Sequence, residues 1–163
     1  MMISNVKGAF TGVKGTVQYD PDAPETSSVQ VDIDASTINT LDPTRDTHLK
    51  SADFLDAAQF PVITFKSARV ERHRDGLRIH GDLTVHGVTR PVTLDVDEIT
   101  PEGKDPWGNT RIGTSAKGKI KRSDFGLAWN AALETGGFLV GDDLKLDFEV
   151  QLIKQSGSAT SAA

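Results

Sequence analysis

Regular alternation of apolar and polar residues is the feature that most constrains the fold of this chain. It is clearest between Leu144 and Leu152, where every second residue of LKLDFEVQL is apolar. A period of two places the apolar side chains on one face of a β-strand and the polar ones on the other. The pattern recurs in stretches that begin at residues 29, 62, 77, 92 and 111. About seven or eight strands joined by short polar turns predict an antiparallel β-sandwich or β-barrel.

Glycines and small polar residues mark where these strands end. Asp75-Gly76 and Gly87 predict reversals between neighbouring strands. Gly12 and Gly15 are expected to break the N-terminal alternation into one or two short strands. The segment QSGSATSAA, residues 155–163, is of low complexity and predicts a flexible C-terminal tail. We therefore expect one domain over residues 1–154 followed by this tail.

One stretch, RDTHLKSADFLDAAQFPVITF at residues 45–65, breaks the alternation. Thr40 or Asp42 can cap the start of a helix whose first turn contains Pro43. A second short turn, which Ser51 or Asp53 can cap, is expected over Phe54 to Ala58, before a proline stops the insert. Next to a barrel, such an insert can act as a lid or plug, or it can simply cover an open end.

Composition limits the class of protein. The chain has 163 residues, of which 37% are hydrophobic and 25% charged, so a soluble globular domain with a real core is expected. No run of about 18 apolar residues is present, so stable membrane insertion is not expected. The absence of cysteine excludes disulfides and thiolate metal sites, and a net charge of −5 disfavours a nucleic-acid partner.

Small residues at predicted inward positions raise the question of what fills the interior. Thr114, Ala116 and Gly118 lie in the middle of one apolar face, and Gly81 lies mid-face in another predicted strand. An eight-stranded barrel is just wide enough to be filled by side chains or to hold one small ligand. Larger side chains can reach into these spaces, or a ligand can occupy them, and the pattern leaves both open.

The polar residues give little sign of catalysis or metal binding. His80 and His86 share a predicted strand face, but six residues of strand separate them by about 20 Å, too far to share one ion. No nucleophile-elbow, Walker or dinucleotide-binding motif is present in the sequence. We therefore expect no enzyme, no catalytic residue, no metal and no cofactor.

Arg122 stands out in the segment 111–122, which contains five basic residues and no acidic one. The other four have outward parity, which favours a solvated face, whereas Arg122 continues the inward parity of the strand. An inward arginine needs a partner, because a buried unpaired charge is costly. That partner is either Asp124, in an internal ion pair, or the polar head of a bound amphiphile.

Four longer stretches occur in a specific order along the chain. They are DASTINTLDPTRDTHLKSADFLDAAQFPVITFKSARV from Asp34, GDLTVHGVTRPVTLDV from Gly81, KIKRSDFGLAW from Lys119 and FLVGDDLKLDFEVQLI from Phe138. No single motif in them is diagnostic, but RDxHL, FPxITF, LTVHGVT, RSDFG and VGD in this order form a specific combination. In this combination, which covers nearly all of residues 5–154, the chain resembles the YceI family of polyisoprenoid-binding, lipocalin-like bacterial proteins.

The resemblance implies an antiparallel, lipocalin-like β-barrel of about eight strands around a long apolar channel. It also implies that the helical insert lies at the barrel mouth, facing or closing the channel. The predicted channel wall consists of Phe54, Leu55, Phe60, Phe65, Leu83, Val85, Ala116, Gly118, Phe125, Trp129, Phe138 and Phe148. The residues expected to meet a polar ligand head at the mouth are Arg45, His48, Asp53, Arg122 and Asp124.

The resemblance further implies a protein that binds and shields a long amphiphilic isoprenoid lipid, a polyprenyl chain or an isoprenoid quinone, for transport or storage. Relatives are often dimers, so a homodimer is one expected state. Two alternatives stay open at this point. One is an enzyme that acts on an apolar substrate, with His48, Asp53 and Arg122 converging at the mouth. The other is a structural or stress protein whose barrel is filled and binds no ligand.

Members of the family usually begin with a further strand upstream of the residues that match MMISNVKGAF. We expect the seam where that strand would lie to be covered by a partner subunit, by the C-terminal tail or by re-pairing of its neighbours. The first residues lack the basic and apolar regions of a signal peptide. A cytoplasmic location is therefore expected for the sequence as written, and a periplasmic one if the natural start lies further upstream.

Overall fold

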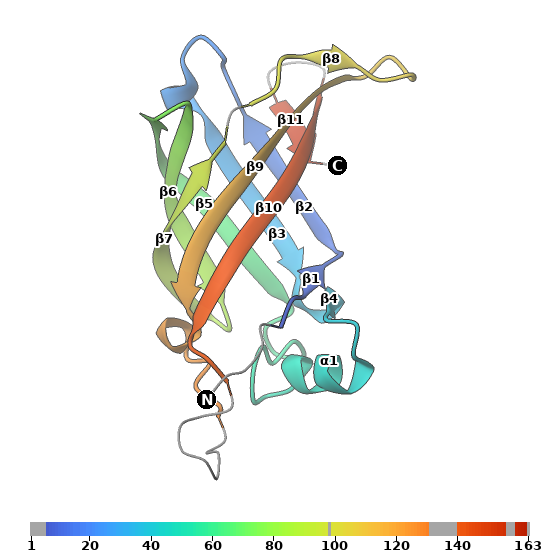
Figure 1. Cartoon of the computed structure of the whole chain (residues 1–163), viewed down its shortest axis with the longest axis vertical. Helices are drawn as coiled ribbons and strands as arrows, with labels where there is room; N and C mark the ends of the chain where they lie inside the picture. The colour runs from blue at the N-terminus through green and yellow to red at the C-terminus, as the bar shows by residue number, and fades with distance from the viewer. Residues whose placement is uncertain (1–5, 98, 131–139, 156–158, 163) are drawn as a thin grey trace.

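The computed structural model describes residues 6–97, 99–130, 140–155 and 159–162. In it, the alternating stretches form one antiparallel β-sheet that closes on itself as a barrel (Figure 1). Around the barrel the strands follow the order β10, β11, β2, β3, β5, β6, β7 and β9, and β9 pairs back with β10. The predicted antiparallel barrel of about eight strands with one short helix is therefore confirmed.

The strands of the ring range from 4 to 12 residues. They are β2 (Val13–Gln18), β3 (Ser28–Asp34), β5 (Val62–His73), β6 (Gly76–Val85), β7 (Val88–Val96), β9 (Thr110–Lys121), β10 (Asp143–Lys154) and β11 (Ala159–Ala162). Three short strands lie outside the ring: β1 (Ala9–Phe10), β4 (Ile38–Asn39) and β8 (Gly103–Lys104). The helical segments are α1 (Pro43–Lys50) and the 3-10 turns η1 (Pro24–Thr26), η2 (Ala35–Thr37) and η3 (Arg122–Phe125).

The C-terminal segment occupies the seam of the ring. β11 pairs with β10 on one side, where Leu152 lies opposite Ala162, and with β2 on the other, where Gln18 lies opposite Ala159. Three ways to cover the seam were considered, and the structure shows the one in which the C-terminal segment pairs with the strands on both sides. This strand lies within the segment for which the composition predicts a flexible tail; that flexibility stays a prediction.

Both predicted hairpin reversals are present. Arg74 has a positive φ of 54° just before the Asp75-Gly76 pair that opens β6. His86 and Gly87, with φ of 55° and 70°, form the two-residue loop between β6 and β7. Two successive positive φ angles match the right-handed twist of the flanking strands, which explains the glycine there. The Phe60 ring packs on this loop, 2.6 Å from where a Cβ atom on Gly87 would lie.

The helix begins as the sequence predicts. Asp42 is its N-cap, and its side chain accepts a hydrogen bond from the N–H of Arg45 at 3.1 Å. Pro43 occupies the first turn, where no N–H is needed. Thr40, the alternative cap, is buried, and its hydroxyl donates to Oδ1 of Asp46 at 2.6 Å. The helix ends at Lys50, close to the mouth of the barrel (Figure 1).

Of two further local predictions, one was confirmed and one was wrong. The short turn expected over Phe54 to Ala58 is present as hydrogen-bonded turns, in which the N–H of Phe54 donates to the Ser51 carbonyl oxygen at 3.0 Å. It does not continue as a helix, because Asp56 has a φ of 48°. Gly15 does not break a strand but lies inside β2, where a Cβ atom would sit 2.6 Å from the carbonyl oxygen of Gln30. It therefore marks a close approach of two backbones.

Within the described ranges, no helix has the length and apolar character needed to cross a bilayer.

Candidate functional site in the barrel interior and at its mouth

The inward faces of the barrel differ in how far they are buried. On β5, β6 and β7, which we name the closed wall, the inward apolar side chains are buried: Ile63, Phe65, Val70, Leu77, Ile79, Leu83, Val85, Val92, Leu94 and Val96. On β9 and β10, which we name the open wall, most inward residues are only partly buried: Ile112, Thr114, Gly118, Ile120, Leu146, Phe148 and Val150. An inward apolar side chain stays accessible only where it borders free space, because packed interiors leave no such gaps.

The small residues predicted to face inward leave less room than their size suggests. A Cβ atom on Gly81 would lie 2.5 Å from Cζ of Phe65, and one on Gly118 would lie 2.7 Å from Cδ2 of Leu94. Neighbouring side chains therefore take the space at these two glycines. Thr114, in the middle of the open wall, stays half-buried.

The predicted wall residues fall into several settings. Buried in the core are Phe65, Leu83, Val85, Ala116 and Phe125. Half-buried are Gly118, Leu55, Phe60 and Phe148. Phe54 and Trp129 belong to a cluster at the mouth, and Phe138 lies outside the described residues. Whether these side chains contact a ligand stays a prediction.

Aromatic rings at the mouth gather around Phe54, which is buried. The His48 ring packs edge-on against Phe54 and Trp129, with centroid distances of 5.0 and 4.7 Å. The rings of Phe54 and Trp129 are 5.2 Å apart, and Oδ2 of Asp53 lies 2.8 Å from Nε2 of His48. These contacts, which we name the mouth cluster, join the helical insert to the segment that follows η3.

Arg122 is buried next to the mouth cluster, with only 6% of its surface exposed. Its guanidinium carbon lies 5.9 Å from the centre of the Phe54 ring. Its nitrogens donate hydrogen bonds of 2.5 to 3.2 Å to the backbone carbonyl oxygens of Leu127, Trp129, Val140 and Gly141. The arginine therefore pins two chain segments together at the end of the open wall.

Asp124 does not take the predicted role of internal partner to Arg122. β9 ends at Lys121, and the 3-10 turn that follows leaves Asp124 exposed instead of extending the inward parity of the strand. The acid that holds this turn is Asp142, which accepts hydrogen bonds from the hydroxyl and the N–H of Ser123 at 2.7 and 2.9 Å. These bonds lower the pKa of Asp142, and the charges of Lys121 and Arg122 add to the effect.

Arg45 donates its side-chain hydrogen bonds to Thr40 and not to a residue of the mouth cluster. Its Nε donates to Oγ1 of Thr40 and its Nη2 to the Thr40 carbonyl oxygen, at 2.8 and 2.9 Å. The Arg-Asp pair of the RDTHL segment thus fixes the chain just before α1, since Asp46 also binds Thr40. A role for Arg45 at a ligand head stays a prediction.

The histidines on β6 and in its turn have separate partners. Nε2 of His80 lies 3.1 Å from Oε1 of Glu71, and its Nδ1 lies 3.2 Å from the hydroxyl of Thr93. The His86 ring packs against Phe60 at 4.9 Å. In the part of the chain that the structure describes, no three His, Asp or Glu side chains are placed to hold a metal ion.

Comparison with known proteins decides the family. A family model described as YceI-like domain matches residues 1–152. This chain belongs to the YceI-like family. Protein YceI of Escherichia coli O157:H7 is 44% identical over 120 residues, and Protein YceI of Salmonella newport (strain SL254) is 43% identical over the same length. Each match covers 74% of this chain and 62% of the relative, so the chain spans less than two thirds of the length of these curated relatives.

Solved structures agree with this assignment. The Campylobacter jejuni YCEI protein, which crystallizes with large solvent channels, has a TM-score of 0.82 at 35% identity, covering 96% of this chain and 89% of that one. Burkholderia cenocepacia BcnA has a TM-score of 0.79 at 23% identity, covering 91% and 89%, a likeness that concerns the fold alone. The resemblance drawn from the motifs is therefore confirmed, as is a YceI-like barrel fold.

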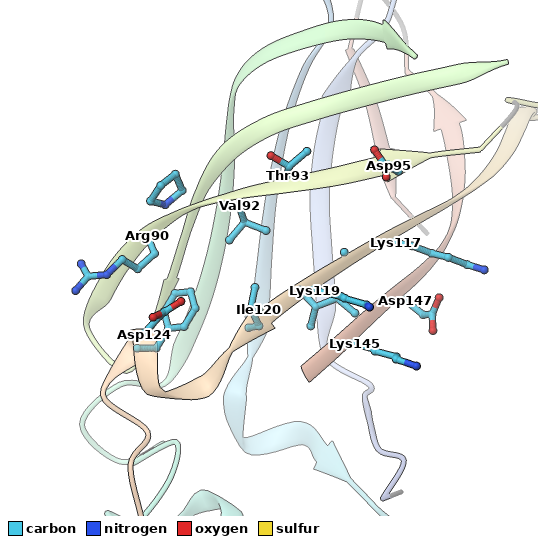
Figure 2. Close-up of a pocket in the computed structure, with 14 residues that line it drawn as sticks. Arg90, Val92, Thr93, Asp95, Lys117, Lys119, Ile120, Asp124, Lys145 and Asp147 are labelled. Atoms are coloured by element: carbon cyan, nitrogen blue, oxygen red, sulfur yellow. The ribbon is translucent and has the colours of Figure 1, made fainter. Parts of the chain in front are cut away.

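One feature of this YceI-like barrel was not predicted: a cavity of about 780 Å³ between β7 and β9 (Figure 2). The two strands pair at residues 95 and 96 of β7 and separate toward η3.

Pro91 is the residue in the sequence that signals this separation of β7 from β9. The N–H of Asp97 points to β9 and donates to the Ser115 carbonyl oxygen at 2.9 Å. Pro91, an even number of residues away, lacks the N–H that would face the same strand, which suits a locally unpaired edge.

Proposed function

We propose that this YceI-like barrel binds and shields one long apolar chain of isoprenoid type, for transport or storage. The observation that carries the proposal is the partial exposure of inward residues along the open wall. β9 and β10 have 12 residues each. Strands of that length extend about 40 Å. A lining of this length suits an extended hydrocarbon chain better than a compact polar ligand.

The energetics of such binding come mainly from burial of the chain. Each CH₂ group removed from water contributes roughly 0.8 kcal/mol, so a long chain can be held without any paired polar group. Lost freedom of the chain and of the lining side chains offsets part of this gain. The choice of an isoprenoid among apolar chains rests on the motifs shared with the family.

The mouth cluster supports binding over catalysis. Nε2 of His48 lies 2.8 Å from Oδ2 of Asp53, and Arg122 lies over the neighbouring Phe54 ring, so the residues of the enzyme alternative are close together. However, the Arg122 guanidinium is directed at backbone carbonyl oxygens and not at an open position for a substrate. A cation that stabilises a transition state must point at the atom where charge develops. We therefore assign the cluster to closing the mouth or orienting a lipid head.

Lipid extraction tests the proposal directly. The protein is purified from a bacterial host that makes isoprenoid lipids, and organic extracts are analysed by mass spectrometry. We expect an isoprenoid lipid in about equimolar amount, because one barrel interior holds one chain. Repeated lipid-free preparations from such a host would contradict the proposal.

A pair of variants on β10 tests where the chain lies. Val150 is inward and half-buried, and its neighbour Gln151 is outward and exposed. Val150→Phe adds a ring to the lining and should sharply reduce the lipid recovered, whereas Gln151→Phe adds the same ring outside and should leave it unchanged. If both variants carry as much lipid as the unaltered protein, the chain does not lie along the open wall.

A further inference from the structure

The exposed apolar side chains of this barrel gather at one end. Among the residues that the structure describes, six large hydrophobic side chains are exposed. Five of them, which we name the apolar rim, belong to the end of the barrel where α1 lies (Figure 1): Val6, Val13, Leu41, Val62 and Leu144. The sixth, Trp107, lies in the turn before β9, at the opposite end. Large exposed apolar side chains are therefore concentrated at the mouth.

The directions of the strands place three rim residues together at this end. β2 and β5 are both antiparallel to β3, and β2 and β10 are both antiparallel to β11. β2, β5 and β10 therefore begin at the same end of the barrel, and β5 begins just after the insert that contains α1. Val13 and Val62 are the first residues of β2 and β5, and Leu144 is the second residue of β10. The rim thus follows an arc of the ring from β10 to β5.

Leu41 is the most exposed member of the rim, and its backbone is strained. Its surface is 91% exposed, and its φ of 64° lies in the left-handed region, which is unfavourable for a residue with a Cβ atom. Oδ1 of Asn39 accepts a hydrogen bond from the N–H of Leu41 at 2.9 Å, and Asp42 caps α1 on the other side. Exposed leucines are common, but strain that the neighbouring structure maintains points to a functional position. The local structure therefore holds an apolar side chain out in the solvent at the mouth.

The rim continues the apolar lining of the barrel. Val13 lies opposite the buried Ile33, so it has inward parity. Leu144 has the same parity as Phe148 on the open wall. Val62 has the opposite parity to the inward residues of β5, so it lies on the outer face. Apolar side chains therefore border the wall of the barrel at this end on both its inner and its outer face.

The charges beside Leu41 give this end no strong preference for an anionic or a cationic partner. The segment from Asp42 to Lys50 carries two acidic and two basic side chains, since it also contains Arg45 and Asp46. Both aspartates accept hydrogen bonds within or next to this segment. Attraction between this end and a partner must therefore come mainly from the apolar surface of the rim.

We propose that the apolar rim docks reversibly on a lipid bilayer, with the Leu41 side chain entering the interface and the mouth facing the lipid. This inference rests on the proposed function and names the surface from which the barrel takes up its chain. A protein partner would need a patch of roughly 800 Å² on each side. The rim consists instead of separate side chains on different strands, and a flat bilayer can contact such an arc at several strands at once. Exposed aliphatic side chains bind a bilayer more strongly as they bury more apolar area.

Binding of the purified full chain to phosphatidylcholine vesicles tests the proposal. Leu41→Asn should lower the affinity for the vesicles about tenfold, because the leucine side chain no longer leaves water. The same substitution should slightly raise the thermal midpoint, because asparagine adopts a positive φ more readily than leucine. A residue that serves only the fold would not show this opposition between binding and stability. Added salt should leave the binding of the unaltered protein undiminished, since the contact is apolar.

Two further variants sharpen the test. Val62→Thr keeps the shape of the side chain but adds a hydroxyl group, so it should lower the affinity for the vesicles by a smaller factor, about two- to threefold. Trp107→Ser is the matched control, because it removes a large exposed side chain at the end of the barrel opposite α1. This control should bind the vesicles as tightly as the unaltered protein.

The possible results separate this inference from the proposed function. Failure of the unaltered protein to bind vesicles would overturn the docking, while an isoprenoid lipid in its organic extract would still support the function. Vesicle binding that depends on Leu41, in a protein that never yields lipid, would support the docking and contradict the function. Loss of vesicle binding in Trp107→Ser, or full binding in Leu41→Asn, would overturn the inference. So would a dimer in vesicle-free solution that Leu41→Asn abolishes, because the rim would then join two copies of the chain.

Discussion

The closed wall and the open wall carry the same alternation of apolar and polar residues, yet their inward faces have different surroundings. On the closed wall, side chains fill the interior, as Phe65 does over Gly81. On the open wall, β9 presents Thr114, Ala116 and Gly118 in sequence, so less side-chain volume is available there. The small inward residues of β9 thus leave the facing side chains of β10, such as Phe148, partly accessible, although the spacing of apolar residues is the same on both walls.

Truncation of one phenylalanine on each wall should give the largest effect. Phe65 is 5% exposed, and Phe65→Ala should lower the free energy of unfolding by about 3–5 kcal/mol, because it leaves a cavity in packed surroundings. Phe148 is half-buried and borders free space, so Phe148→Ala should cost about 1–2 kcal/mol. Urea unfolding of the delipidated proteins measures both values. Equal losses would remove the distinction between the walls.

Variants of Arg122 test how much the hydrogen bonds at the mouth contribute to the stability of the protein. Arg122→Met leaves several carbonyl oxygens without a donor and should lower the free energy of unfolding by about 2–3 kcal/mol. Arg122→Lys keeps the charge but cannot supply the same set of donors, so it should lose about half as much. The near-ultraviolet circular dichroism of Trp129 should weaken in both variants. Unchanged stability in Arg122→Met would show that the mouth holds together without these bonds.

The smallest effect is expected at the far end of the open wall, in the turn before β9. Oδ2 of Asp105 accepts a hydrogen bond from Nε of Arg111 at 2.6 Å, and Oδ1 accepts from the N–H groups of Trp107 and Asn109 at 2.9 Å. The bond from Arg111 is the main cause that lowers the pKa of Asp105 from 3.8 to about 2. The folded-state pKa lies below that of the unfolded chain, so the ionised carboxylate stabilises the fold at higher pH.

This contribution should be complete above about pH 4 and should disappear as the pH falls toward 2. The thermal midpoint of the protein should fall as the pH is lowered from about 4 to about 2, and it should fall less steeply in Asp105→Asn. On the closed wall, the hydrogen bond from Arg78 lowers the pKa of Asp95, so Asp95→Asn offers a matched comparison. If Asp105→Asn and the unaltered protein show the same acid profile, the turn adds no pH-dependent stability.

The parts of the fold that depend on local pattern could be predicted. Strand positions follow from parity alone, and the start of α1 follows from Asp42 and Pro43. The turn at His86-Gly87 follows from the need for positive φ. The left-handed Asp56 and the close approach at Gly15 could not be predicted, because tertiary contacts impose both.

In the candidate site, contacts between two side chains could be predicted from the sequence, whereas contacts with backbone atoms could not. His48, Asp53 and Phe54 lie on one insert, so their proximity follows from the sequence. The acceptors of Arg122 are backbone carbonyls, which have no sequence signature, and the ion pair with Asp124 was therefore the wrong expectation. The cavity between β7 and β9 depends on how these two strands pair, which alternation within single strands does not specify.

The mouth cluster also gives the molecule its own optical probe. The chain has two tryptophans. Trp107 is 81% exposed in the turn before β9, whereas Trp129 packs against His48 and Phe54. Exchange of Trp107 for phenylalanine leaves a single indole, so the intrinsic emission of that protein would come from the entrance to the barrel alone. Arrival and departure of a guest at this entrance would then be visible in real time without any attached dye.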